Sequence, residues 1–123
     1  LQVGVTTAQV KEFLGQAHRK LGMTASFGAA QFGEATAYPH GVPYEQTLQD
    51  GDMVLIDMGT KVGGYCSDIT RTLVFGEPTQ RQREIWNLEK KAQLAGFAAA
   101  QRGAPCENVD FAARSVIEAA GYG

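Results

Sequence analysis

Two aspartates stand eleven residues apart in the segment GDMVLIDMGTKVGGYCSDITRT, which runs from Gly51 to Thr72. Asp57 lies in the run MVLIDM, where both faces of a strand would be apolar, so we expect this strand to be covered on both faces. A buried carboxylate without a partner costs several kcal/mol or is forced to take up a proton. The sequence therefore implies a partner for Asp57.

The alternation of side chains along a strand indicates where that partner lies. We predict two strands, at about residues 53–58 and 65–75, joined by a turn around Lys61 to Gly64. A tight turn there makes the numbers of paired residues sum to an odd value such as 125 or 127. Unless a bulge intervenes, Asp57 then shares its face with four residues, which are Cys66, Asp68, Thr70 and Thr72.

Two carboxylates thus converge without a cation of their own hairpin, because Arg71 falls on the opposite face. Such a pair is repulsive unless it shares a proton or a cation, and a metal ion is the natural candidate. The alternative is that one aspartate is solvated at the sheet edge or paired with a distant arginine. Cys66 lies close enough in sequence to be weighed as a ligand, with a reduced structural thiol as the alternative.

A second candidate is His40, which stands in the proline-braced loop YPHGVP shortly before the hairpin. An imidazole held on such a loop is a candidate for a functional role. The alternative is a purely structural histidine.

The composition argues against several classes of function. The 123 residues are 44% hydrophobic and 20% charged with a net charge of −2, which is typical of one soluble globular domain. Charges of both signs are interspersed, so we expect no nucleic-acid partner. No apolar stretch approaches the ~20 residues that cross a bilayer, and the first residues lack the pattern of a signal peptide. We therefore expect no membrane partner and a cytoplasmic location.

The elements that must position these residues follow from caps and periodicity. A first helix should begin after Thr6, whose capping box uses Gln9, and should end at Gly22. The segment from Ser26 to Ala37 predicts a weak strand followed by a loop. Two further helices are expected, one from a cap at Thr79 to about residue 101 and one at about 107–120.

The last predicted helix repeats the first at an offset of 99 residues. Placing Gly121 on Gly22 superposes Val109 on Val10, and three further apolar positions of the two helices coincide as well. One amphipathic helix resembles another, so the match only hints at an internal repeat of helix followed by hairpin.

Four segments together resemble the pita-bread metallopeptidases, especially the proline-specific branch of Xaa-Pro dipeptidases (prolidases) and aminopeptidase P. They are PHGVP, LQDGDMVLIDMG, GGYCSDITRTLVFGEPT and VDFAARSVIEAAGYG. The resemblance implies an α+β, partial pita-bread (creatinase/aminopeptidase-like) fold, with a helix and an antiparallel hairpin followed by two further helices. Residues 1–80 would form the first helix-and-hairpin half of a catalytic domain, and residues 81–123 the start of the second.

The resemblance also assigns roles to the candidate residues. In such proteins the position of Asp57 is a bidentate metal ligand, and that of Asp68 bridges two divalent ions. The position of His40 hydrogen-bonds the substrate near the scissile peptide, and Thr70 would support the ligands. Manganese is favoured by oxygen-rich ligands, with cobalt, zinc or iron as alternatives. A peptide substrate and a homodimer are the expected partners.

The chain departs from the family pattern in one respect, since the pattern needs a further histidine and two glutamates beyond the position of Gly123. We therefore expect a fragment of an Xaa-Pro exopeptidase that is inactive alone, binds metal weakly or not at all, and self-associates through an exposed apolar patch. Two other classes remain open. One is a metal-free, creatinase-like C–N hydrolase, and the other is a pita-bread module that binds proteins without catalysis.

Overall fold

A computed structural model describes residues 1–23 and 26–123. These residues form two compact units, Leu1–Pro78 and Thr79–Gly123, and each is considered by itself. Helices and an antiparallel sheet are both present, so the predicted α+β class is confirmed. The expected assignment of residues 1–80 and 81–123 to two halves of one catalytic domain stays a prediction.

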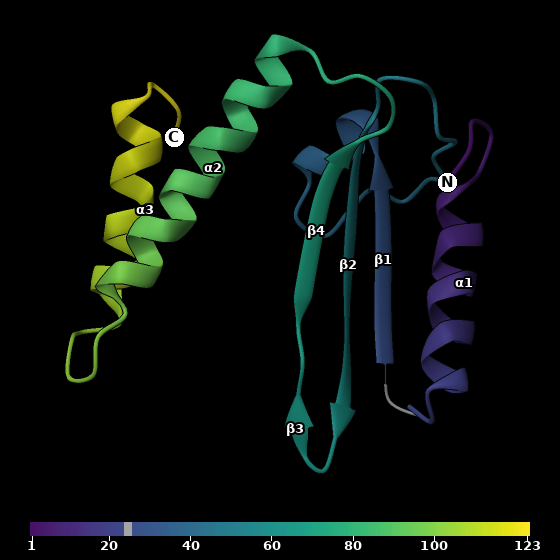
Figure 1. The fold of residues 1–123 in the computed structure, drawn as a ribbon, viewed down its shortest axis with the longest axis horizontal. Helices are drawn as coiled ribbons and strands as arrows, with labels where there is room; N and C mark the ends of the chain where they lie inside the picture. Colours follow the sequence, from purple (N-terminus) through teal and green to yellow (C-terminus); the bar gives the residue numbers. More distant parts are fainter. Residues whose placement is uncertain (24–25) are drawn as a thin grey trace. The chain divides into compact units, whose positions relative to one another are not determined.

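The first unit is an antiparallel sheet with one long helix (Figure 1). In chain order its elements are α1 (Thr7–Lys20), β1 (Ser26–Phe32), the 3₁₀ helix η1 (Gly33–Ala37), β2 (Met53–Val62), β3 (Tyr65–Cys66) and β4 (Ile69–Val74). The central strand is β2, which pairs with β1 on one side and with β3 and β4 on the other. The strand that carries Asp57 therefore has a hydrogen-bonded neighbour on both edges.

Local sequence chemistry sets the ends of α1. The Thr6 side chain accepts a hydrogen bond from the Gln9 amide, and the Gln9 side chain accepts one from the Thr6 amide. Gly22 follows the helix with φ +78°, a conformation that L side chains rarely adopt. The predicted capping box and glycine stop are both confirmed.

The segment after β1 differs in part from the sequence prediction. The strand itself was expected, but Gly33–Ala37 forms the 3₁₀ helix η1 where a loop was predicted. The Thr36 hydroxyl donates to the Gly33 carbonyl at 2.8 Å, which stabilises this short turn of helix. The loop prediction was wrong here because a 3₁₀ helix of five residues is too short to show an apolar period in the sequence.

The hairpin has the register that the parity argument requires. Gly63 and Gly64 form its tip with φ values of +58° and +87°, the two positive angles of a type I′ turn. Every pair in the β2–β3 and β2–β4 ladders has residue numbers that sum to 127. The returning strand was predicted as continuous from 65 to 75, yet it is interrupted at Ser67 and Asp68.

The hydrophobic core of this unit lies between α1 and one face of the sheet. Its buried members are Val10, Leu14, Ala30, Phe32, Leu48 and Val54. On the opposite face of β2, Leu55 and Asp57 are only half-buried. The core and α1 thus cover the Val54 face of the strand, and the expected cover on its Asp57 face stays a prediction.

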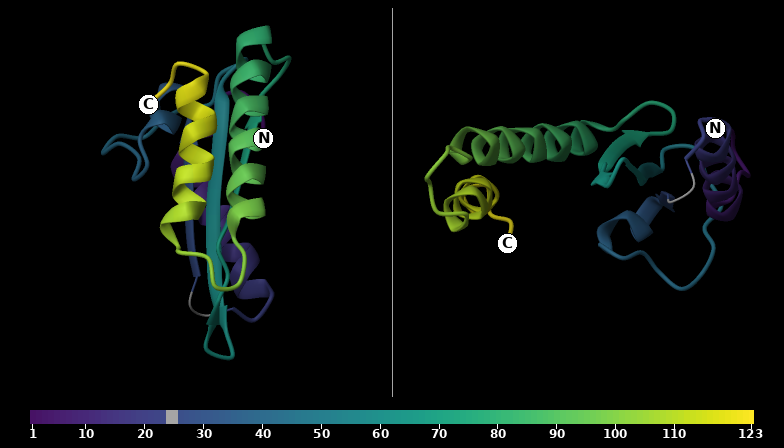
Figure 2. Two further views of the ribbon diagram at one scale, coloured as in Figure 1. Left: turned by 90° about the vertical axis from the view of Figure 1, so that its left-hand side faces the viewer. Right: turned by 90° about the horizontal axis from the view of Figure 1, so that it is seen from below.

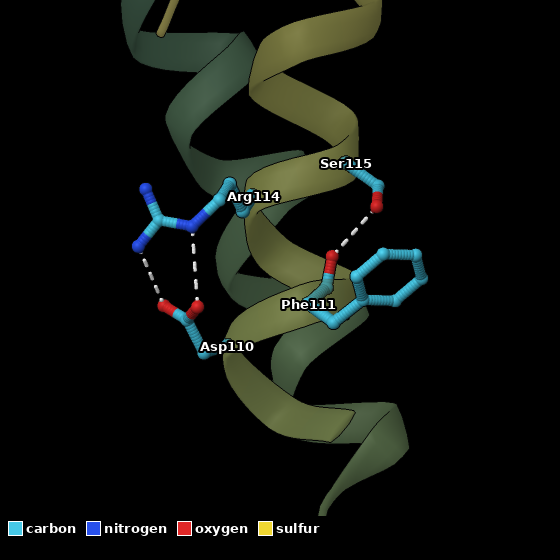
Figure 3. A network of polar contacts seen from close by, with 4 residues as sticks. All are labelled: Asp110, Phe111, Arg114 and Ser115. Atoms are coloured by element: carbon cyan, nitrogen blue, oxygen red, sulfur yellow. Dashed lines mark hydrogen bonds and ion pairs between the residues drawn. The ribbon is translucent and has the colours of Figure 1, made fainter. Parts of the chain in front are cut away.

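The second unit consists of two helices, α2 (Gln80–Ala99) and α3 (Glu107–Ala119), which lie side by side as an antiparallel pair (Figures 1 and 2). Thr79 and Gln82 form the predicted capping box of α2. Along α3, the guanidinium of Arg114 binds both carboxylate oxygens of Asp110 at 3.0 and 3.1 Å (Figure 3). The bidentate contact with Asp110 raises the pKa of Arg114.

The two helices that suggested an internal repeat end in the same way. Gly22 and Gly121 have φ values of +78° and +83°. The next amide, on Met23 or Tyr122, donates to the carbonyl five residues before it, on His18 or Ile117. The two helix ends, 99 residues apart, thus share the same type of C-terminal cap. This type of cap is common in proteins. The repeat itself stays a prediction.

Among the described residues, no helix has both the length and the apolar character needed to span a bilayer.

The core predicts a clear difference between two leucines. Leu48 is completely buried, so Leu48→Ala should lower the free energy of unfolding by about 2–5 kcal/mol through lost contacts and a cavity. Leu21 is 71% exposed and provides the same substitution as a control, with an expected change below about 0.5 kcal/mol. Denaturant titration measures both values, and equal effects would contradict the core described above.

Candidate metal and substrate site

Asp57 lies in the middle of the central strand β2, on the face away from the hydrophobic core. Its direct neighbours in the two ladders are Ala29 on β1 and Thr70 on β4. The Thr70 hydroxyl donates to Asp57 Oδ1 at 2.7 Å, a usual length for a hydrogen bond between two oxygens. The hairpin thus holds one oxygen of Asp57 in a defined direction.

Asp68 lies one residue before β4, at the interruption of the ladder. The Ser67 amide still donates to the Thr60 carbonyl at 2.8 Å, but the Thr60 amide donates to the Ser67 hydroxyl oxygen at 3.1 Å. Because the sum of 127 holds on both sides, no residue is inserted. By this count Asp68 falls opposite Gly59 and has the parity of Asp57's face, although Asp68 itself belongs to no pair of the ladder.

The absence of a side chain at Gly59 leaves room for this interruption. A Cβ atom added there would lie 2.2 Å from the Ser67 carbonyl oxygen and 2.4 Å from Cε1 of Phe27. The exposed Phe27 ring could move, but the Ser67 carbonyl belongs to the backbone directly before Asp68. Glycine at position 59 therefore allows the backbone directly before Asp68 to approach β2 this closely.

His40 lines the same cavity as Asp57. The cavity has a volume of about 460 Å³, and its walls come from the start of α1, from β1 and β2, and from the loop at residues 39–46. His40 itself is exposed within a turn of that loop. His40 thus shares a cavity with Asp57, whereas Asp68 is not among the residues that line it. The catalytic role of His40 stays a prediction.

The loop that carries His40 is attached to α1 at its far end. The Thr7 amide donates to the Gln46 carbonyl at 3.0 Å, and the Gln46 amide donates to the Thr7 hydroxyl at 3.3 Å. Thr7 is buried, and an isolated bridge pairs Thr6 with Thr47 next to it. The start of α1 therefore fixes one wall of the cavity.

Arg71 and Cys66, which lie near the two aspartates in sequence, have the positions that the register of the hairpin gives them. Arg71 stands opposite Ile56, on the face away from Asp57, and its Nη1 donates to the Thr70 carbonyl at 2.8 Å. Cys66 is an exposed free thiol paired with Lys61 in the β2–β3 ladder.

Sequence reasoning did not single out Gln31, which is buried on β1 and lines the cavity. The available signal was a polar residue in an apolar strand, and the pairing of β1 with β2 puts that residue on the same face of the sheet as Asp57.

The donor atoms fit part of a metal site. Two carboxylates, one of them oriented by a hydroxyl, are ligands that hard divalent cations such as manganese prefer. Within residues 1–23 and 26–123, no three His, Cys, Asp or Glu side chains gather in a way that could hold a metal ion. Asp57 and Asp68 thus fit as two ligands of a larger set.

Comparisons with known proteins define the class. The family model described as "Metallopeptidase family M24" matches residues 1–123, so the chain belongs to this family. It is 37% identical over 125 residues to an uncharacterised peptidase of Staphylococcus aureus, covering all of this chain and 36% of that protein. The chain therefore spans about a third of the length of the curated relatives it matches.

Two solved structures extend the comparison. An Xaa-Pro dipeptidase from Bacillus anthracis is 38% identical with a TM-score of 0.92, and the match covers all of this chain and 35% of that one. An X-Pro aminopeptidase from Thermotoga maritima is 30% identical with a TM-score of 0.93, over all of this chain and 36% of that one. The predicted family and its partial pita-bread fold are confirmed.

The contact at Gly59 yields a testable prediction. Gly59→Ala should destabilise the protein by about 1–3 kcal/mol, because the new methyl group collides with the Ser67 carbonyl. Gly15→Ala, in the interior of α1 with only the flexible Arg19 side chain at 3.4 Å, should stabilise it by about 0.5–1 kcal/mol. Thermal unfolding measures both changes. A neutral Gly59→Ala variant would contradict the close approach of the two strands.

Proposed function

We propose that this chain is part of a metal-dependent exopeptidase that removes one N-terminal residue, with Xaa-Pro dipeptides or Xaa-Pro peptides as substrates. The observation that carries the proposal is the Asp57 carboxylate, oriented by Thr70 on a face shared by register with Asp68. Membership of a metallopeptidase family supports the reaction class. The proline-specific names of the similar structures support the substrate class.

In this proposal the two aspartates are ligands of a pair of divalent cations. Asp57 has one oxygen fixed by Thr70, which leaves the other oxygen and the remaining lone pairs of the carboxylate available. Asp68 would be the second ligand from this hairpin. Divalent ions held there, preferably manganese, would supply an activated water and polarise the scissile carbonyl.

His40 would bind the substrate beside Asp57. It lines the cavity that also contains Asp57, so a peptide bound there meets both groups. The imidazole can donate a hydrogen bond to the substrate near the scissile bond and thereby orient it. The remaining metal ligands would lie outside the 123 residues, and we propose that these residues alone hydrolyse no Xaa-Pro dipeptide.

The setting of the enzyme is part of the same proposal. We propose that it acts on peptides in the cytoplasm as a homodimer. Size-exclusion chromatography with light scattering on the intact protein tests the dimer, and a monomer at micromolar concentration would contradict it.

Removing either proposed ligand should abolish activity. In the intact protein, Asp57→Asn and Asp68→Asn should each lower kcat/KM on an Xaa-Pro dipeptide by at least about 100-fold with manganese present, because an amide is a poor ligand for these ions. Asp110→Asn makes the same change in the exposed ion pair of α3 and should leave kcat/KM within about twofold. A matched dipeptide without proline tests the substrate class. Full activity of Asp57→Asn would refute the proposed site.

The Thr70 hydroxyl should matter through Asp57. Thr70→Val keeps the shape but removes the donor, so we expect metal affinity or activity to fall by about 10- to 100-fold. Thr70→Ser retains the hydroxyl and should stay within a few-fold of the original protein. Calorimetric titration with manganese and steady-state kinetics measure the two effects, and equal behaviour of both variants would exclude this role.

A further inference from the structure

Gln31 places a polar amide in the interior of the sheet, on the face of the candidate site. Its residue is only 6% exposed, although it lies on a strand whose neighbours Ala30 and Phe32 belong to the core. It pairs with Leu55 on β2, two positions along the ladder from the pair of Ala29 with Asp57. A buried amide is retained where its hydrogen bonds are satisfied by defined partners.

The partner of Gln31 is the turn that carries His40. Gln31 Nε2 donates to the Tyr38 carbonyl oxygen at 2.8 Å, and the Gly41 amide donates to the same oxygen at 2.9 Å. One carbonyl thus closes the turn from residue 38 to residue 41 and attaches it to β1. His40 lies inside this closed turn.

The backbone of the turn rests directly on the Gln31 side chain. Gly41 has φ +74°, and a Cβ atom added there would lie 2.9 Å from Gln31 Nε2. Gly41 therefore meets both the conformational and the steric requirement of this contact. The turn has little freedom to shift toward β1 while the amide stays in place.

We propose that Gln31 is a positioning residue, which holds the turn at residues 38–41 so that His40 stays in the cavity it shares with Asp57. The role of His40 in this inference rests on the proposed function, whereas its placement by Gln31 does not. A shift of about 1 Å in a substrate-orienting group can cost about 100-fold in rate, so a fixed turn has a direct catalytic consequence.

The first test measures the turn itself. In the intact protein, Gln31→Met keeps the length of the side chain but removes the donor, and it should speed deuterium uptake in peptides covering residues 38–41 by roughly tenfold. Gln101→Met is the matched control, because Gln101 also donates its Nε2 to a backbone carbonyl, that of Ala98 at 3.0 Å on α2. It should leave uptake at 38–41 unchanged. Unchanged uptake in Gln31→Met would overturn the proposal.

The second test asks whether Gln31 acts through His40. Gln31→Met should lower kcat on an Xaa-Pro dipeptide by roughly 10- to 100-fold with a smaller change in KM, and it should cost nothing further in a His40→Ala background. Equal losses in both backgrounds would show a structural role and overturn the proposal. An intact protein without Xaa-Pro activity would refute the proposed function, while deuterium uptake would still decide the placement.

A second variant covers the case in which Gln31→Met does not fold. Gly41→Ala strains the positive φ and presses a methyl group against the Gln31 amide from the opposite side, leaving β1 intact. The proposal expects the same faster uptake at residues 38–41 and the same loss of effect in the His40→Ala background. A Gly41→Ala variant with unchanged uptake would contradict it.

Discussion

The register of the β2 hairpin is the constraint on which the candidate site depends. Two glycines at its tip adopt positive φ values, and this turn fixes a sum of 127 for every pair in both ladders. A slip by one residue would turn each side chain of one strand to the other face. It would separate Asp57 from Thr70 and from the face assigned to Asp68, and it would bring Arg71 to the face of Asp57. The chemistry of the site thus follows from the geometry of a two-residue turn.

The local break in the ladder is compatible with this register because no residue is inserted. The Ser67 hydroxyl takes the place of a backbone acceptor for Thr60, so the break leaves the Thr60 amide satisfied. Gly59 provides the space into which the Ser67 carbonyl turns. The ladder therefore continues past Asp68 in the same register, while Asp68 itself lies outside the regular strand.

Long connections with little regular structure supply the other wall of the cavity. The chain from Tyr38 to Leu48 is held at one end by Gln31 and at the other by Thr7, so it does not depend on strands of its own. The Leu48 side chain is fully buried in the core, which couples this loop to the packing of α1 on the sheet. Stability of the core and shape of the cavity are therefore linked, as is usual where loops on a rigid scaffold carry function.

The sequence by itself determined the features that arise from short-range chemistry. Capping boxes at Thr6 and Thr79, the glycine stop after α1, and the parity of the hairpin depend on contacts within a few residues. The motif around the two aspartates also sufficed to indicate the family. These predictions succeeded because propensity, pattern and turn chemistry agree over those segments.

The tertiary structure decided what depends on groups far apart in the chain. Which face of β2 packs against α1 could not be read from the run MVLIDM, since an apolar strand does not reveal which element covers each of its faces. The 3₁₀ turn at Gly33–Ala37 depends on side-chain bonds that follow no simple period. The place of His40 beside Asp57 and the burial of Gln31 under its turn depend on the return path of the loop. Only the folded chain decides these contacts, because loop paths are set by packing and hydrogen bonds between distant segments rather than by local propensity.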